Sequence, residues 1–120
     1  MNHVLVVDDD RAIVGTVQAV LVDEGYDVTT AADGREALAE LQREMPSLVL
    51  LDMRMPVMDG WRFAQEVKQQ GLRVPIVVMT AAQDARRWAS EIGANGYVSK
   101  PFDIDQLLDV VATHRLQHGH

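Results

Sequence analysis

Short and nearly uninterrupted apolar runs alternate with amphipathic stretches along the whole chain. A run without polar positions is typical of a strand that is buried on both faces, as strands are in a parallel sheet. The runs predict strands at residues 3–7, 27–31, 48–51, 75–79 and 97–99. The second of them, DVTTA, is more polar than the rest and therefore suits the edge of a sheet.

The stretches between these strands carry apolar residues at i, i+3 and i+4, the pattern of a helix with one buried face. Asp33 with Glu36 and Asp103 with Gln106 have the spacing of capping boxes at two helix starts. No linker or repeat interrupts the alternation, so we expect one α/β domain over residues 1–120, with a doubly wound parallel sheet of five strands. The predicted helices span residues 10–24, 34–44, 60–70, 84–92 and 104–116.

Composition and charge narrow the class of protein. The chain has no cysteine, which excludes disulfides and thiolate metal ligands. Its net charge of -7 argues against direct nucleic acid binding by this domain, because such binding needs a basic surface. No apolar run approaches the ~18 residues of a membrane span, and the start has no signal-peptide pattern. We therefore expect a cytoplasmic protein without membrane contact.

Polar side chains stand where four of the five predicted strands end. They are Asp8, Asp9 and Asp10 after the first strand, Asp52 after the third, Thr80 after the fourth and Lys100 at the end of the fifth. The carboxyl ends of parallel strands share one edge of the sheet, and open α/β sheets bind ligands at that edge. We expect these side chains to converge there.

Such a cluster indicates a cation and a phosphoryl group. Oxygen ligands without cysteine suit a hard cation, and the small number of carboxylates favours Mg²⁺ over a fully caged Ca²⁺. The metal and Lys100 would offset charge on phosphoryl oxygens, Thr80 would donate to one of them, and a carboxylate would attack in line. Taken singly, each residue has an ordinary structural explanation, and Asp10 is best read as a helix N-cap. The functional hypothesis rests on their joint placement.

The segments VLVVDDD, LLDMRMPVMDG, VVMTA and GYVSKPF, in this order and spacing, carry a family resemblance. Over nearly its full length the chain resembles a response-regulator receiver domain of two-component signalling, of the chemotaxis-regulator-like kind. The resemblance implies a flavodoxin-like fold with strand order 2-1-3-4-5 and five helices. It also implies that Asp52 is the phospho-acceptor, and that Asp8, Asp9, Asp52 and the backbone carbonyl of Arg54 bind Mg²⁺, with Mn²⁺ as a substitute.

The remaining motif positions acquire roles from the same resemblance. Thr80 and Tyr97 correspond to the switch pair, in which the aromatic side chain changes rotamer as the hydroxyl moves. Lys100 corresponds to the lysine that contacts the phosphoryl group, and the Lys100–Pro101 peptide bond to the family's cis peptide, which X–Pro bonds adopt readily.

The resemblance implies a phosphorelay switch. The phosphoryl group would come from a sensor histidine kinase, a histidine phosphotransfer protein or a small donor such as acetyl phosphate. The face formed by the fourth helix, the fifth strand and the fifth helix would then change and signal an unknown output domain or protein, with a phosphorylation-dependent dimer as a further option. The domain would catalyse its own phosphorylation and slow dephosphorylation and would not be an enzyme with a separate substrate.

Two surfaces are candidates for partner contacts. Arg86 and Arg87 lie beside the output face, where they either meet the output partner or form a solvated surface. Ala12 and Gly15 lie on the outward side of the first helix, where a small, partly apolar strip suits a helix that carries the donor histidine. Gly15 costs about 1 kcal/mol relative to Ala within a helix. Tolerated drift explains it equally well.

Two positions vary in the family and affect the lifetime of the phosphoryl group, and here they hold Arg54 and Ala82. Arg54 either reaches over the site and pairs with phosphate or an acid, or extends into water. Ala82 offers no polar group. The residues His114, His118 and His120 near the C-terminus indicate a frayed helix end rather than a metal site.

Two other functions compete with the phospho-acceptor hypothesis. A pseudo-receiver would bind partners without phosphorylation, although such domains normally have a degraded site and this one is intact. A Mg²⁺-dependent phosphatase of the haloacid dehalogenase class would use Asp52 as nucleophile, with a second Asp two residues further on. Arg54 occupies that position, so the general acid is missing.

Overall fold

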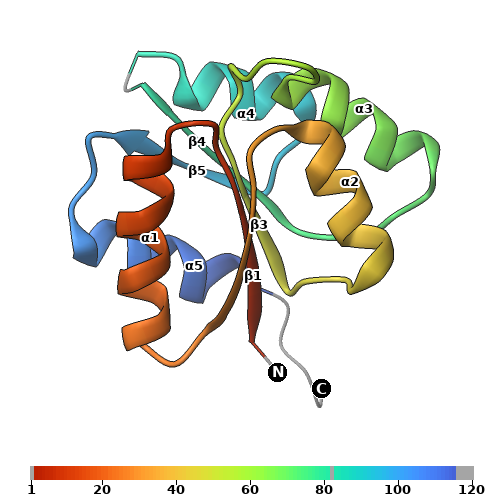
Figure 1. The fold of residues 1–120 in the computed structure, drawn as a ribbon. Coiled ribbons are helices and arrows are strands. Elements are labelled where there is room, and N and C mark those ends of the chain that lie inside the picture. Colours follow the sequence, from red (N-terminus) through yellow and green to blue (C-terminus); the bar gives the residue numbers. More distant parts are fainter. Residues whose placement is uncertain (1, 82, 116–120) are drawn as a thin grey trace.

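The computed structural model describes residues 2–81 and 83–115 (Figure 1). Our expectations for Ala82, His118 and His120 fall on positions outside these described residues.

A central sheet of five parallel strands has the order β2-β1-β3-β4-β5. This confirms the predicted fold class and strand order. The strands are β1 (His3–Val7), β2 (Asp27–Ala31), β3 (Leu48–Leu51), β4 (Ile76–Ala81) and β5 (Gly96–Lys100). The helices between and after them are α1 (Arg11–Asp23), α2 (Gly34–Arg43), α3 (Gly60–Gln69), α4 (Ala85–Ile92) and α5 (Ile104–His114).

Helices cover both faces of the sheet (Figure 1). Leu5 and Val7 of β1 point to the face covered by α2, α3 and α4. Val4 and Val6, the alternate residues of the same strand, point to the face covered by α1 and α5. Successive side chains of a strand point to opposite faces, so a strand between two helical layers has to be apolar at every position. This explains the uninterrupted runs, and the polar β2 does lie at an edge.

Side-chain caps fix where the helices begin. Asp10 accepts hydrogen bonds from the Ala12 and Ile13 backbone N–H groups at 3.0 and 3.3 Å, which confirms it as the N-cap of α1. Asp103 and Gln106 form a complete capping box at α5. The box at α2 is incomplete. Its Asp33 accepts from the backbone of Glu36, but the Glu36 carboxylate accepts from the N–H of Ala32 and not from that of Asp33.

Val57 has the left-handed backbone conformation, with φ of 67°. It lies in the loop between β3 and α3, and 78% of it is exposed. A β-branched residue is strained at positive φ, because its Cβ approaches the following carbonyl oxygen. So exposed a side chain gains little from burial to offset that strain.

Val57→Gly should therefore raise the free energy of unfolding by about 1 kcal/mol, which urea denaturation would measure. Val57→Ala is the matched control. Alanine keeps a Cβ and should not give this gain. A glycine variant no more stable than the alanine variant would show that the loop relaxes without cost.

Candidate functional site

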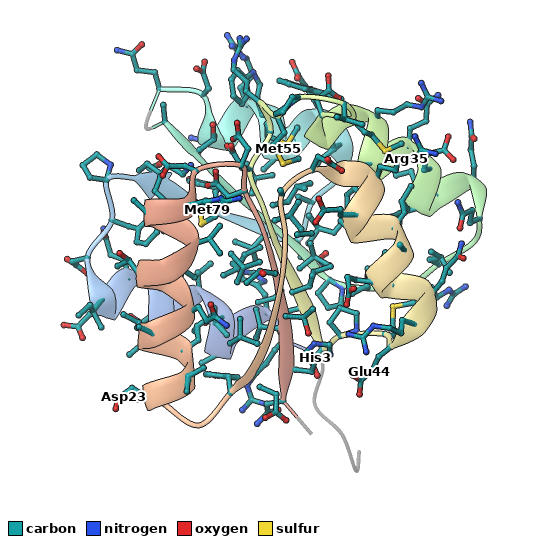
Figure 2. All side chains as sticks on the ribbon, viewed as in Figure 1. His3, Asp23, Arg35, Glu44, Met55 and Met79 are labelled. Carbon is teal, nitrogen blue, oxygen red and sulfur yellow. The ribbon has the colours of Figure 1, made fainter. Side chains whose placement is uncertain are left out.

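The sheet register brings the predicted site residues to one edge. Asp8 and Asp52 directly follow Val7 and Leu51, which are paired across neighbouring strands β1 and β3. The backbone N–H of Asp52 still donates to the Val7 carbonyl at 2.9 Å, so sheet hydrogen bonding holds it in place. Met55 and Met79 mark this edge in Figure 2, while His3 and Glu44 mark the opposite one.

Three carboxylates gather at this edge. Oxygen atoms of Asp8, Asp9 and Asp52 lie within 4.8 Å of one another. Asp8 and Asp52 are only 2% and 7% exposed, whereas Asp9 faces solvent. Buried like charges this close repel one another unless a cation lies among them.

Lys100 is that cation in the structure. Its Nζ atom lies 2.7 Å from Asp8 Oδ2 and 3.6 Å from Asp52 Oδ1. The second oxygen of Asp8 accepts from the backbone N–H of Asp10 at 2.9 Å. Lys100 is the last residue of β5, and the peptide bond that follows it, to Pro101, is cis. The fifth strand therefore contacts the first across the intervening strands.

The electrostatics of Asp52 follow from this crowding. Burial raises the pKa of Asp52 to about 6, and repulsion from Asp8 acts in the same direction. The Lys100 ammonium and the Met53 N–H, which donates to Asp52 Oδ1 at 2.9 Å, act in the opposite direction. A raised pKa marks a carboxylate that is poorly solvated as an anion and therefore gains from a bound cation.

A tight turn after β3 shapes the loop that carries Asp52. The N–H of Gly60 donates to the Met53 carbonyl at 2.9 Å, so α3 begins directly against the residue that follows Asp52. A Cβ at position 60 would lie 2.8 Å from the Met53 Cα. Only glycine permits this approach, which explains the DG pair before α3.

Thr80 and Tyr97 lie on neighbouring strands. Thr80 is buried on β4 and pairs with Ser99 of β5, while Tyr97 pairs with Val78 and is exposed. Tyr97 borders a hollow between β5 and α5 that Asp109 and His114 also line. The structure thus places the predicted switch pair on adjacent strands, with the hydroxyl inside and the aromatic ring outside.

Arg54 is exposed to solvent, as one of the two courses left open by the sequence had it, but it also contacts an aromatic ring. Its guanidinium carbon lies 5.1 Å from the centroid of the Trp88 ring on α4. Sequence reasoning missed this contact, because nothing in the local pattern links a loop residue to a helix so far along the chain. Trp88 itself is buried in the core, whereas Arg86 and Arg87 beside it are exposed.

The first helix presents an open surface next to Lys100. Ala12 and Gly15 are exposed, and a Cβ at Gly15 would meet no atom within 4 Å. An open groove of about 420 Å³ runs alongside, and most of its lining is apolar. Its walls are Ala12, Ile13, Thr16 and Val17 of α1 and Lys100, Pro101 and Phe102 after β5.

A comparison with known families now decides the identity of the domain. Residues 4–112 match the family described as Response regulator receiver domain. The chain belongs to this family. No helix among the described residues of this receiver domain is long and apolar enough to cross a membrane.

Curated relatives of the receiver domain include transcriptional regulators. "Alkaline phosphatase synthesis transcriptional regulatory protein PhoP" of Bacillus subtilis (strain 168) is 42% identical over 103 residues, which cover 84% of this chain and 43% of that protein. "Probable transcriptional regulator ycf27" of Cyanophora paradoxa is 43% identical over 108 residues, with 88% and 45% covered. The chain thus spans less than half the length of these relatives.

Solved structures agree on the fold. Chemotaxis response regulator CheY4 of Vibrio cholerae is similar with a TM-score of 0.85 at 38% identity, covering 94% of this chain and 98% of that one. The receiver domain of NtrX from Brucella abortus has a TM-score of 0.84 at 33% identity, covering 92% and 95%. Receiver domains therefore share this architecture at moderate sequence identity.

The raised pKa of Asp52 predicts how stability depends on pH without metal. Between the ordinary value of 3.8 and about 6, the folded state binds the proton more tightly than the unfolded state, so stability falls as pH rises. Asp52→Asn should raise the free energy of unfolding above that window by on the order of 1 kcal/mol, since solvent screens part of the effect. Urea unfolding in EDTA at several pH values measures this gain. A gain that does not shrink as the pH falls through the window would contradict the prediction.

Proposed function

We propose that Asp52 accepts a phosphoryl group and that the receiver domain acts as a phosphorylation switch. The observation that carries this proposal is the position of Asp52. It is a nearly buried carboxylate with a raised pKa, grouped with Asp8 and Asp9 and within 3.6 Å of an ammonium group. An ion pair that served stability alone would not need three crowded carboxylates.

The transfer step balances with a phosphohistidine donor. A carboxylate oxygen of Asp52 forms a bond to phosphorus while the P–N bond to the donor imidazole breaks. The bonding electrons stay on the imidazole nitrogen, which then takes up a proton. With acetyl phosphate the P–O bond breaks instead and acetate leaves. Lys100 is close enough to approach the phosphoryl oxygens once Asp52 carries them.

The site fits a magnesium ion by its donor chemistry. Asp8, Asp9 and Asp52 each offer one carboxylate oxygen. The resemblance to receiver domains adds the backbone carbonyl of Arg54 as a further candidate. These hard oxygen donors suit Mg²⁺, with Mn²⁺ as a substitute. When bound, such an ion would neutralise negative charge on the carboxylates and on the phosphoryl oxygens.

The switch follows from a competition for Lys100. In the structure the lysine pairs with Asp8. A phosphoryl group on Asp52 adds about 1.5 to 2 negative charges and strong acceptors, which attract Lys100 and the Thr80 hydroxyl. Movement of Thr80 would vacate space for the Tyr97 ring and so bias the surface of α4, β5 and α5 toward a second packing.

Two surfaces of the domain would bind partners, one the phosphoryl donor and the other the output. The groove between α1 and Pro101 would receive the donor helix of a sensor histidine kinase or histidine phosphotransfer protein, because it adjoins the site. Arg86 and Arg87 would meet the output domain or protein. The names of the relatives favour control of transcription, exerted by a part of the protein other than this acidic domain. A phosphorylation-dependent dimer on the same face remains part of this proposal.

The phosphatase alternative is disfavoured by Arg54. That class of enzyme has its general acid two residues after the nucleophile, and here Arg54 occupies this position with its side chain against Trp88. We therefore propose no separate substrate, and the domain would catalyse only its own phosphorylation and slow dephosphorylation.

Incubation with acetyl phosphate tests the central step. The intact mass should increase by one phosphoryl group with Mg²⁺ present and not with EDTA, and Asp52→Asn should abolish the increase. If the wild type shows no gain, incubation with phosphorylated histidine kinases decides the matter. No gain there either would leave the domain as a pseudo-receiver that binds partners without phosphorylation.

Gly15→Leu tests the donor surface. The added side chain would cover the open strip of α1 and should slow transfer from a histidine kinase by at least about tenfold, as for a contact worth ~1.4 kcal/mol. Transfer from acetyl phosphate should not change. Ala39→Leu places the same leucine side chain at an exposed position of α2 and should leave both rates unaltered. Equal slowing with both donors would contradict docking at α1.

A further inference from the structure

The guanidinium of Arg54 is stacked on an indole although it belongs to the loop that carries Asp52. The 5.1 Å between its Cζ atom and the Trp88 ring centroid is a cation–π distance. Arg54 is exposed, whereas Trp88 is 5% exposed and belongs to α4. The contact therefore joins a solvent-facing cation of the site loop to a buried ring of the output helix.

The indole is a rigid platform. Trp88 packs edge to face with Trp61 of α3, with ring centroids 4.9 Å apart and an interplanar angle of 68°. Trp61 in turn donates from its Nε1 atom to Glu91 Oε1 at 2.9 Å. Packing of this kind limits the movement of Trp88 within α4, whereas the exposed Arg54 side chain is not held in this way.

A second cation competes for the same ring. The Arg87 guanidinium carbon lies 5.9 Å from the Trp88 centroid, but Asp84 holds Arg87 at 2.8 Å. Arg54 has no such anchor, because it takes part in none of the ion pairs found among residues 2–81 and 83–115. Of these two arginines, only Arg54 is free to exchange its aromatic contact for an anion.

A phosphoryl group on Asp52 would provide that anion two residues away. Guanidinium groups bind phosphate oxygens through paired, charge-assisted hydrogen bonds, which are stronger than an exposed cation–π contact. The side chain of Arg54 is long enough to turn from the indole toward its own loop. To reach those oxygens Arg54 would turn away from the ring, since they would lie on its own loop after β3 and the ring belongs to α4.

We propose that Trp88 is a positioning residue for Arg54, holding the guanidinium clear of Asp52 before phosphorylation and releasing it to the phosphoryl oxygens afterwards. This inference rests on the proposed phosphorylation of Asp52 and adds the residue that sets the position of Arg54. An exposed cation–π contact favours the held position by about two- to fivefold. Removal of the ring face therefore shifts Arg54 toward the phosphoryl group by that factor.

Trp88 emission reports the exchange directly. The chain has two tryptophans, so Trp61→Phe leaves Trp88 as the only tryptophan, which is excited selectively over the two tyrosines at the red edge of the absorption band. Acetyl phosphate and Mg²⁺ should change the emission of this protein in step with the gain of one phosphoryl group in the intact mass. In Trp61→Phe/Arg54→Gln the mass gain should persist, while at least half of the emission change should disappear. Arg54→Lys should restore part of it, because lysine also binds both rings and phosphate.

Arg35→Gln is the matched control in the Trp61→Phe background. It removes another exposed arginine, on α2, which is labelled in Figure 2 and contacts no aromatic ring among the described residues. Its emission change should equal that of the parent. An emission change that survives Arg54→Gln undiminished would overturn the inference.

The rate of phosphoryl loss gives a second, independent readout. In Trp88→Leu the freed Arg54 should lie across the phosphoryl oxygens, cover them from water and slow the loss about two- to fivefold. Combined with Arg54→Gln, the Trp88 substitution should have no such effect. Trp88→Phe, which keeps a ring and the packing, should show the same effect more weakly if the leucine variant does not fold.

The outcomes separate the two proposals. If no variant gains a phosphoryl group from acetyl phosphate or from histidine kinases, the proposed function and this inference both fail. In the other case the mass increases, while Arg54→Gln leaves the Trp88 emission change intact and Trp88→Leu leaves the rate of phosphoryl loss unchanged. Phosphorylation of Asp52 then stands and the role of Trp88 is overturned.

Discussion

The pairing of Lys100 with Asp8 and Asp52 is the interaction on which the functional edge of this receiver domain depends. Two nearly buried carboxylates and a third, exposed one lie close together, and the ammonium group of Lys100 offsets the repulsion between the two buried ones. Since β5 is separated from β1 by two strands, the lysine also connects distant parts of the sheet. A group added to Asp52 would therefore alter the contact of the fifth strand with the first.

The rest of the fold provides a rigid frame for this electrostatic balance. Every strand next to the site is packed between two helical layers, so the backbone of Asp8 and Asp52 cannot relax away from the crowding. The Asp52 carboxylate responds through its raised pKa instead. Stability is thus given up locally at a place where a cation or a phosphoryl group would recover it.

Helix α4 contacts both the strands of the site and the loop that carries Asp52. It packs against β4 and β5, the strands of Thr80 and Tyr97, and Arg54 contacts its Trp88 ring. The helix is short, spanning Ala85–Ile92, and its N-cap residue Asp84 pairs with Arg87 instead of capping the backbone. A short helix without a side-chain cap is held mainly by its buried face, in which Trp88 is the largest side chain. Contacts with that one ring therefore contribute much to how α4 is held in place.

The sequence by itself determined the layers of the fold and the edge where chemistry is concentrated. Apolar runs reported burial on both faces, and the polar residues that end the strands had to meet because parallel strands share a carboxyl edge. Local sequence pattern also predicted the N-cap role of Asp10, which precedes a helix, and the edge position of β2, which is the most polar strand.

Only the tertiary structure decided the contacts between residues far apart in the chain. It placed Lys100 on Asp8, stacked Arg54 on Trp88, and put Val57 into the left-handed region. None of these leaves a periodic signal, because each depends on how a loop closes against a packed neighbour and not on the period of a helix or strand. Sequence patterns record which face of an element is buried, while the partner of a long charged side chain is settled by the packed fold in three dimensions.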